Sequence, residues 1–459
     1  MLRPLLRIAV LASLLAALLA PVTRAGTLTV GPTGSGAQFD DLVAAVSAAG
    51  AGDVILVAAG SYVGGSTLVI DKSLTILGEG SGVTSYEIVA GDIFSVQLPL
   101  HVLNLTPGEE VRIVGLELSA RASAFGGKAA GGLLVSGCQG PVVFADVVSG
   151  GPVTISAPAV VQVQASAQVS FDRCAFGASV GQSGAPPLAL IVEDSKVYLN
   201  SCALAGSSAP APVAPSVAFD GAVGVRLTNS ELRLSRTVVL GGDGMVETPF
   251  FSPPSLTSGG AAVEAIGSSN VFARGGPGNL LLGGFGGHKF TGAGNQYGPG
   301  GAAVLLDPGA GLASVSDSVL VAGTTVQGVA STPAVDGTGI WGQVAEPLAT
   351  LGTSTSLVAP GSSVTLELAS APGATVVTLI AAGQIPALTL AGIHGEVILN
   401  PFAYSVLALT TLDTAGLGSH QASVPPVASL VGGTVLAQTL AVNPSGDLSF
   451  SAPILVAVR

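Results

Sequence analysis

Seven residues in the middle of the sequence combine rings, bases and carboxylates as sugar-binding surfaces do. They are Asp243, Glu247, Phe250, Phe251, His288, Lys289 and Tyr297. Aromatic rings pack on the CH faces of a sugar, while polar side chains bond to its hydroxyls. All seven fall in Gly-rich segments, 242–260 and 283–301, which follow a similar segment at 205–222. We therefore predict a ligand-binding surface on these loops, with ordinary loop variability as the competing interpretation.

The elements that would carry these loops are predicted by a repeated phrase. Alternating apolar residues, a small polar residue, an apolar pair and a Gly recur along the chain. The polar position is occupied in turn by Cys174, Cys202, Thr237, Asn279 and Ser318, at intervals of 28, 35, 42 and 39 residues. Fixed strands with loops of unequal length are typical of stacked coils, in which neighbouring coils share one core. We predict that these residues form a buried ladder, with a Cys174–Cys202 disulfide as the alternative.

A second pattern lies near the start of the sequence. The segment 38–50 predicts an amphipathic helix, because Phe39, Leu42, Val43 and Val46 share one face. It is followed by GDVILV at 52–57, Gly60-Ser-Tyr62 and LTILGEG at 74–80. Together with FDDLVAAV at 39–46, these segments resemble the opening of right-handed parallel β-helix proteins of the pectin-lyase-like superfamily. The resemblance implies an all-β solenoid whose N-terminal end is capped by the helix, over residues 26–329.

The same resemblance implies lyase, hydrolase or esterase activity, or no known chemistry. The motifs of the hydrolases and esterases are absent. The nearest arrangement to a lyase site, which would need Ca²⁺ and a base, is Asp172, Arg173, Glu193, Asp194 and Lys196. We interpret these residues as a solvated strand edge. The scattered His101, His394 and His420 predict no metal site, and no serine stands in a recognisable nucleophile motif.

Both ends of the sequence differ from the repeat. A basic start, an apolar run from Ile8 to Ala20 and a small residue at Ala25 predict a signal peptide over 1–25, and hence a secreted, cell-surface or periplasmic protein without a membrane span. Residues 330–345 predict a linker. Beyond them, alternating strands between Pro-Gly and Gly-Gly turns predict a small antiparallel β-sandwich over 346–459, which resembles a C-terminal module of exported bacterial proteins.

The composition limits the partners of the chain. Only 9% of residues are charged, 65 are Gly, and the net charge is −12. An acidic surface repels nucleic acid and anionic lipid. Three functions stay open: a non-catalytic exported protein that binds a polysaccharide or a cell-envelope component, a polysaccharide lyase or hydrolase, and an adhesin-like spacer. We expect the first, with no cofactor; Ca²⁺ would be needed only by a lyase.

Overall fold

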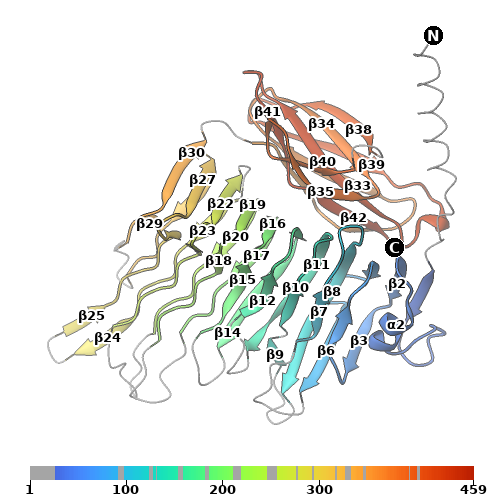
Figure 1. Cartoon of the computed structure of the whole chain (residues 1–459), viewed down its shortest axis with the longest axis horizontal. Helices are drawn as coiled ribbons and strands as arrows, with labels where there is room; N and C mark the ends of the chain where they lie inside the picture. Colours follow the sequence, from blue (N-terminus) through green and yellow to red (C-terminus); the bar gives the residue numbers. More distant parts are fainter. Residues whose placement is uncertain are drawn as a thin grey trace.

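The computed structural model describes residues 26–90, 98–122, 128–130, 132–153, 159–180, 186–209, 219–245, 256–274, 278–291, 294–315, 318–325, 332–344, 348–391, 393–400 and 404–459. The predicted signal peptide, and Glu247, Phe250 and Phe251 of the predicted binding loops, lie outside these residues. The described chain is almost entirely β-structure, built as a parallel solenoid with a second unit of sheets along one side (Figure 1).

Each complete coil of the solenoid contributes a strand to each of three faces, and neighbouring strands within a face pair in parallel. The strands of the first face are β1 (Thr27–Val30), β2 (Asp53–Val57), β5 (Leu74–Leu77), β8 (Val111–Ala122), β11 (Val142–Val153), β13 (Val169–Asp172), β16 (Lys196–Asn200), β19 (Glu231–Ser235), β22 (Asn270–Arg274), β27 (Gly311–Val315) and β30 (Ile340–Val344).

The long strands β8 and β11 continue from the first face into the second. The other strands of the second face are β3 (Gly60–Gly64), β6 (Thr84–Ala90), β14 (Ala175–Val180), β17 (Ala203–Ala205), β20 (Val238–Leu240), β23 (Leu280–Leu282) and β28 (Val319–Val321). The third face contains β4 (Leu68–Ile70), β7 (Leu100–Leu103), β10 (Leu133–Ser136), β12 (Ala159–Gln164), β15 (Leu188–Glu193), β18 (Val225–Thr228), β21 (Val263–Ile266), β26 (Val304–Leu306) and β29 (Val335–Gly337). In addition, β9 (Lys128–Ala130) pairs antiparallel with β8, and β24 (His288–Thr291) forms a hairpin with β25 (Gly294–Tyr297).

The corners between faces are made by residues in the left-handed region of backbone space. Arg173, Ser201 and Arg236 have φ of 50°, 54° and 52° between the first and second faces. Asp194 and Asn229 do the same, at 46° and 48°, between the third and first faces. A single left-handed residue turns the chain sharply without a loop. The residue that follows each of them points into the stack.

These inward residues form two ladders of hydrogen bonds across coils. The predicted ladder is confirmed: the N–H of Cys202 donates to Thr237 Oγ1 at 3.3 Å, and that of Thr237 to Asn279 Oδ1 at 2.8 Å. The three cysteines are buried and unpaired, so the disulfide alternative is wrong. A second ladder, at the other corner, was not predicted. In it, the N–H of Ser166 donates to Ser195 Oγ at 2.9 Å, and that of Ser195 to Ser230 Oγ at 3.1 Å.

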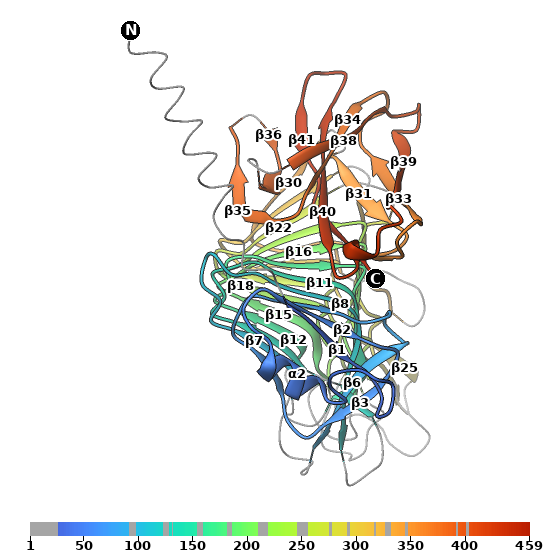
Figure 2. The ribbon, with the colours of Figure 1, turned by 90° about the vertical axis from the view of Figure 1, so that its right-hand side faces the viewer.

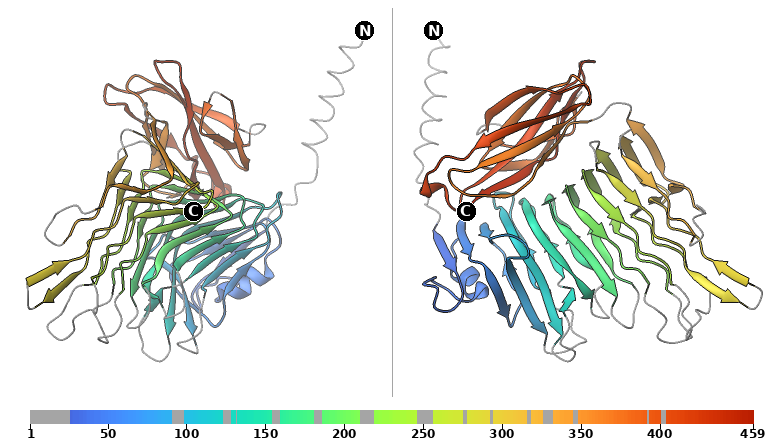
Figure 3. Two further views of the ribbon diagram at one scale, coloured as in Figure 1. Left: turned by 60° about the vertical axis from the view of Figure 1, so that its left-hand side comes forward. Right: turned by 180° about the vertical axis from the view of Figure 1, so that it is seen from behind.

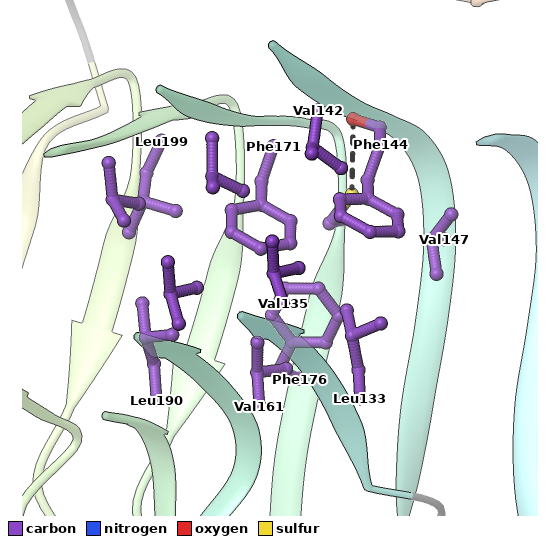
Figure 4. Close-up of a cluster of buried hydrophobic side chains, with 14 of the residues drawn as sticks. Leu133, Val135, Val142, Phe144, Val147, Val161, Phe171, Phe176, Leu190 and Leu199 are labelled. Atoms are coloured by element: carbon purple, nitrogen blue, oxygen red, sulfur yellow. Dashed lines mark hydrogen bonds between the residues drawn. The ribbon is translucent and has the colours of Figure 1, made fainter. Parts of the chain in front are cut away.

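Apolar side chains fill the interior between the three faces (Figure 4). Phe144 and Phe171, in register on neighbouring coils, stack with ring centroids 5.1 Å apart. Phe176 from the second face meets Phe171 edge-on at 5.2 Å. Such aromatic pairs add to the stabilisation that comes from burial.

Helix α2 (Leu42–Ala48) lies at the N-terminal end of the stack and is shorter than the predicted 38–50. Asp41 caps it by accepting from the N–H groups of Val43 and Ala44. Gln38 and Phe39 are instead held beside the first strand: the Gln38 side chain accepts from the Thr29 N–H, and Phe39 bridges Val30. The helix buries Leu42, Ala45 and Val46 in the solenoid core.

The other end of the stack corrects one prediction. The predicted linker at 330–345 contains β29 and β30, which pair in parallel with β26 and β27. The solenoid therefore extends to Val344. Of the residues that indicated a linker, Pro333 precedes β29, Gly337 is its last residue, and Gly339 lies between β29 and β30.

The C-terminal unit begins beyond this point. It contains an antiparallel sheet of β31, β33 and β39, a mainly antiparallel seven-stranded sheet built on β34 and β40, and the hairpin β35–β37. Side chains from the two larger sheets share one core, which includes Leu351, Leu366, Val376 and Ile454. The bounds of its elements are β31 (Thr350–Thr353), β32 (Leu357–Val358), β33 (Ser363–Ala369), β34 (Thr375–Ala381), β35 (Gln384–Thr389), β36 (Ile393–His394), β37 (Glu396–Leu399), β38 (Tyr404–Thr411), β39 (Leu417–Ser423), η1 (Ala428–Leu430), β40 (Thr434–Val442), β41 (Leu448–Phe450) and β42 (Ile454–Val458).

The C-terminal unit lies along the outside of the first face (Figure 2). Toward the N-terminal coils the contact is apolar: Leu77, Val114 and Val143 pack with Leu436 and Leu455 in one buried cluster. The Arg459 guanidinium donates to the backbone oxygens of Val57 and Leu77 at 2.6 and 2.8 Å. The first face is thus covered over these coils, whereas the second and third faces keep partly exposed outward side chains.

Candidate functional site

The third face runs along the stack through β7, β10, β12, β15 and β18, all but β10 of which are labelled in Figure 2. It carries two rows of outward side chains. Strand register defines both rows. Row 1 is Val69, His101, Leu134, Gln162, Ile191, Arg226, Glu264, Leu305 and Asp336. Row 2 is Leu103, Ser136, Gln164, Glu193, Thr228 and Ile266. Most of these side chains are half-buried. Neighbours within a row stand one strand spacing apart, about 4.8 Å.

Polar members of the two rows are joined across coils. His101 Nε2 lies 2.8 Å from Ser136 Oγ. Gln164 Nε2 donates to Glu193 Oε2 at 3.1 Å, and Arg226 Nε donates to Glu264 Oε2 at 2.5 Å. Partial burial lowers the pKa of His101, which favours its neutral form at neutral pH. The third face therefore offers a linear series of hydrogen-bond donors and acceptors.

Beside this sheet, the described bases of the Gly-rich loops between the second and third faces lie on the side seen at the bottom of Figure 3 (right). In each loop an outgoing leg leaves the second face and a returning leg enters the third. On the outgoing legs, the N–H groups of Gly241 and Gly244 donate to Leu282 and Phe285 of the next coil, each at 2.8 Å. Gly242, between them, donates to Ala222 of a returning leg. Backbone N–H groups three residues apart thus donate to the same neighbouring leg, as expected for an extended backbone with three residues per turn.

The legs are too close for side chains at their contact positions. A Cβ on Gly242 would lie 1.9 Å from the carbonyl oxygen of Ser207, and one on Gly284 would lie 1.9 Å from that of Gly242. On the returning legs, a Cβ on Gly260 or Gly301 would come within 2.0 Å of a backbone oxygen. The absence of a Cβ is what lets these backbones approach. The loop bases therefore form a hydrogen-bonded array rather than separate flexible segments.

The predicted binding residues within the described chain take different places in this array. Asp243 Oδ1 accepts from the Phe285 N–H at 2.8 Å, so this carboxylate joins two outgoing legs. His288 and Tyr297 face each other across the β24–β25 hairpin, with their rings stacked at 5.0 Å. Lys289 is half-buried on the same hairpin. Their binding role stays a prediction, as does that of Glu247, Phe250 and Phe251.

The set of residues compared with a lyase site does not converge. Asp172 is buried, pairs with Arg173 at 2.8 Å and accepts from Asn200 Nδ2 at 2.9 Å. Burial raises the pKa of Asp172, against the lowering effect of Arg173 and Asn200. Lys196 contacts Glu231 and Glu396, whereas Glu193 bonds to Gln164 on the third face. Among the described residues, no group of three or more His, Cys, Asp or Glu side chains is placed to hold a metal ion.

Glu396 is a buried carboxylate with several charged and polar partners, and the sequence did not predict it. It belongs to the C-terminal unit, is 3% exposed, and bonds to Lys196 at 2.7 Å and Arg233 at 3.1 Å on the solenoid. The Tyr198 hydroxyl also donates to it. The cavity at this contact measures about 10 Å³, which has room for at most one water. This cluster therefore fastens the two units together and has no space for a substrate.

No helix in the described ranges is both long and apolar enough to cross a membrane.

Comparison with known proteins adds little to this picture. Neither a protein-family model nor a curated protein matches the chain. Among solved structures, it is similar to the catalytic domain of a GH87 α-1,3-glucanase, with 12% identity, coverage of 67% of this chain and 43% of that one, and a TM-score of 0.25.

Two other similar structures are the enzymatically active domain of tailspike protein 2 from an Escherichia coli O157:H7 bacteriophage and the A-module of a mannuronan C-5 epimerase from Azotobacter vinelandii. The first has 9% identity, covers 88% of this chain and 68% of that one, and has a TM-score of 0.23. The second has 10% identity, covers 65% and 93%, and has a TM-score of 0.19. The chain spans about half the length of the Bacillus subtilis sporulation protein Spo0M that it also matches (49%) and of the glucanase domain (43%). The scores are too low to carry a functional conclusion.

Proposed function

We propose that the protein is exported and binds a polysaccharide along the third face of its solenoid, without cleaving the glycosidic bonds. The observation that carries this proposal is the pair of outward rows, in which polar side chains recur at one strand spacing over successive coils. A linear polymer with repeated hydroxyl groups can meet such groups coil after coil. The Arg226 guanidinium has donors beyond the one that it gives to Glu264, and they suit hydroxyls or sugar carboxylates.

The arrangement of carboxylates on this face favours binding over hydrolysis. Glycoside hydrolysis needs two carboxyl groups about 5 to 9.5 Å apart. Glu193 and Glu264 lie on β15 and β21, two coils apart and in different rows, which places their Cα atoms about 12 Å apart. Glu264 and Asp336 share row 1 two coils apart, a Cα separation of about 10 Å. That second pair is the observation that favours the alternative, a glycoside hydrolase.

Binding is tested with affinity electrophoresis of the purified chain in gels that contain neutral or acidic polysaccharides. We expect retardation by at least one polysaccharide, and about tenfold weaker binding for Arg226→Ala, because a charge-assisted hydrogen bond is lost. Gln162→Ala, in the same row, should weaken binding less. Gln421→Ala is the matched control, since Gln421 is exposed on β39 of the C-terminal unit. Equal binding by all three variants would rule out the third face.

The loops are tested in the same gels. Lys289→Ala and Tyr297→Ala examine the hairpin, and Phe250→Ala and Phe251→Ala examine the loop outside the described residues. A loss with these variants but not with Arg226→Ala would move the binding surface from the sheet to the loops. Reducing ends and unsaturated products are measured in parallel, with and without Ca²⁺. Turnover that is lost in Glu264→Gln or Asp336→Asn would replace binding by hydrolysis as the function.

A further inference from the structure

One pair on the third face unites a nucleophile with a base. Ser136 ends strand β10, immediately before Gly137, whose φ of 65° turns the chain at the corner. His101, on the preceding coil, places Nε2 2.8 Å from Ser136 Oγ. Both side chains are half-buried on the third face. A serine hydroxyl is a weak nucleophile until an adjacent base takes its proton, and this distance allows the transfer.

The charge state of His101 suits the role of base. Its pKa is lowered by partial burial, so the ring is neutral at neutral pH. In the tautomer with its proton on Nδ1, Nε2 has a lone pair that accepts from the Ser136 hydroxyl. The other polar pairs of the two rows, Gln164–Glu193 and Arg226–Glu264, join a donor to a carboxylate and contain no nucleophile of this kind.

A candidate oxyanion donor lies on the next coil. Gln164 is in register with Ser136 on the neighbouring strand, so their Cα atoms are about 4.8 Å apart. The Glu193 carboxylate can only accept, so its bond to Gln164 Nε2 fixes which side of the amide carries the N–H groups. The second N–H of that amide is left for an oxygen beside Ser136. Such a donor is effective when it is held in place before the reaction.

Two leucines complete the surroundings. Leu103 is in register with Ser136, on the side opposite Gln164, and Leu134 is in register with His101. Both are half-buried on the outer surface. Leu103 and Leu134 form an apolar surface beside the Ser136 hydroxyl, which fits a small acyl chain. The surface on the other side of Ser136, at Gln164, is polar. The asymmetry would orient an ester with its acyl group over the leucines and its carbonyl oxygen toward the amide.

We propose that Ser136 and His101 form an acyl-transfer dyad that removes small ester-linked acyl groups, such as acetyl, from a polysaccharide bound on the third face. The substrate class rests on the proposed function; the dyad itself does not. Ser136 Oγ attacks the ester carbonyl as its proton passes to His101 Nε2, and Gln164 bonds to the resulting oxyanion. The ester C–O bond then breaks, and His101 gives the proton to the departing sugar alkoxide.

Deacylation restores the enzyme with water as the only co-reactant. His101 takes a proton from water, the hydroxide attacks the acyl–Ser136 carbonyl, and the proton returns to Ser136 Oγ as the carboxylic acid leaves. The glycosidic bonds of the polymer are untouched. The dyad lies on β7 and β10, which are four and three strands from β18 and its Arg226, so a chain bound along row 1 would pass over it.

The test is covalent labelling of the intact chain with a fluorophosphonate probe, followed by peptide mass spectrometry. We expect the probe on Ser136, background signal in Ser136→Ala, and labelling about 100-fold slower in His101→Ala because the base is lost. Ser61→Ala, which changes an exposed serine on the second face, is the matched control and should label as the wild type does. Circular dichroism melting verifies that each variant is folded.

Two results would overturn the dyad: no label on Ser136 in the folded wild type, or an unchanged labelling rate in His101→Ala. Hydrolysis of p-nitrophenyl acetate gives a second readout, in which Gln164→Ala should lower kcat by about tenfold or more with little change in KM. Because labelling needs no glycan, its failure leaves the binding proposal standing. A labelled protein that is not retarded by any polysaccharide would instead retain the dyad and remove the substrate class.

Discussion

Lys196 Nζ of the solenoid lies 2.7 Å from Glu396 Oε1 of the C-terminal unit, across 200 residues of sequence. Arg233 and Tyr198 complete the surroundings of the same carboxylate. Arg233 in turn stacks over Phe272, with its guanidinium carbon 4.9 Å from the ring centroid. A buried carboxylate with this many donors stays charged at little cost in folding free energy. Removing its partners, or removing the carboxylate from them, is strongly destabilising because a buried charge is left without compensation. The contact therefore decides how firmly the C-terminal unit stays on the first face.

We expect Glu396→Gln to destabilise the protein by about 2–4 kcal/mol, because Lys196 and Arg233 lose a buried anionic partner. Urea unfolding followed by circular dichroism measures the loss. The matched control is Glu367→Gln, which breaks the pair with Arg236 on the same contact. Glu367 is 46% exposed, so its loss should cost less than about 1 kcal/mol. Equal effects of the two substitutions would contradict a special role for Glu396.

The same carboxylate should make stability dependent on acid. Burial alone would raise the pKa of Glu396, but bonds from Lys196 and Tyr198 and the charge of Arg233 outweigh it and hold the pKa below its ordinary value. Its stabilising contribution is then complete above about pH 4.3, the ordinary value, and is lost as pH falls through the lower folded value. We expect the unfolding midpoint to drop in that window, and to drop less in Glu396→Gln. Asp172, whose pKa is raised by burial, acts in the opposite direction, so the series is best measured in an Asp172→Asn background.

The serine ladder gives a prediction that separates hydrogen bonding from packing. In Ser195→Ala, the Ser166 N–H loses its acceptor at 2.9 Å and is left buried without one, which should cost about 1–3 kcal/mol. Ser195→Cys should cost less, because Cys138 already occupies the equivalent position on an earlier coil and its thiol donates to the oxygens of Val102 and Ser136. Thermal melting of the two variants tests this order. A milder effect of alanine than of cysteine would show that space, not bonding, limits the ladder.

The glycine array predicts that one added methyl group is harmful at a chosen position. Gly242→Ala would place its Cβ 1.9 Å from the Ser207 carbonyl oxygen, so neighbouring legs must move apart. We expect faster limited proteolysis of the loops and a loss of more than about 1 kcal/mol. Gly65→Ala is the control: its Cβ would have open space, and alanine there should be neutral or slightly stabilising. Proteolysis that is unchanged in Gly242→Ala would mean that the legs are not held together.

The sequence predicted those features that repeat along the chain. Cys174, Cys202 and Thr237 could be aligned because each follows a strand of the same phrase, and the structure places them on one ladder. The serine ladder carried a comparable signal, since its members lie 28, 29, 35 and 39 residues apart, but its flanking strands are less alike. Ladders are predictable because stacking forces equivalent residues into register.

The features that the sequence did not predict depend on contacts between residues that do not occupy equivalent positions of the repeat. His101 and Ser136 are diagonal neighbours, so their contact requires the register of β7 on β10 to be known. The site of Glu396 depends on how a separately folded unit docks. The predicted linker was wrong because strands of three to five residues suffice for a coil when the preceding coil offers strands to pair with, and the Pro and Gly residues in and around β29 outweighed this signal in the sequence. The helix 42–48 began late because Gln38 and Phe39 had partners in β1.

The three-residue rhythm of the glycine legs constrains how these loops can change in length. Inserting one residue into a leg would rotate every later N–H by about 120° and aim it away from its acceptor, whereas inserting three would lengthen the leg and keep each donor on its partner. Natural or engineered extensions should therefore come in multiples of three, added to adjacent legs together. The glycine legs can then differ in length by steps of three residues, while the loop segments beyond them keep their orientation relative to the solenoid.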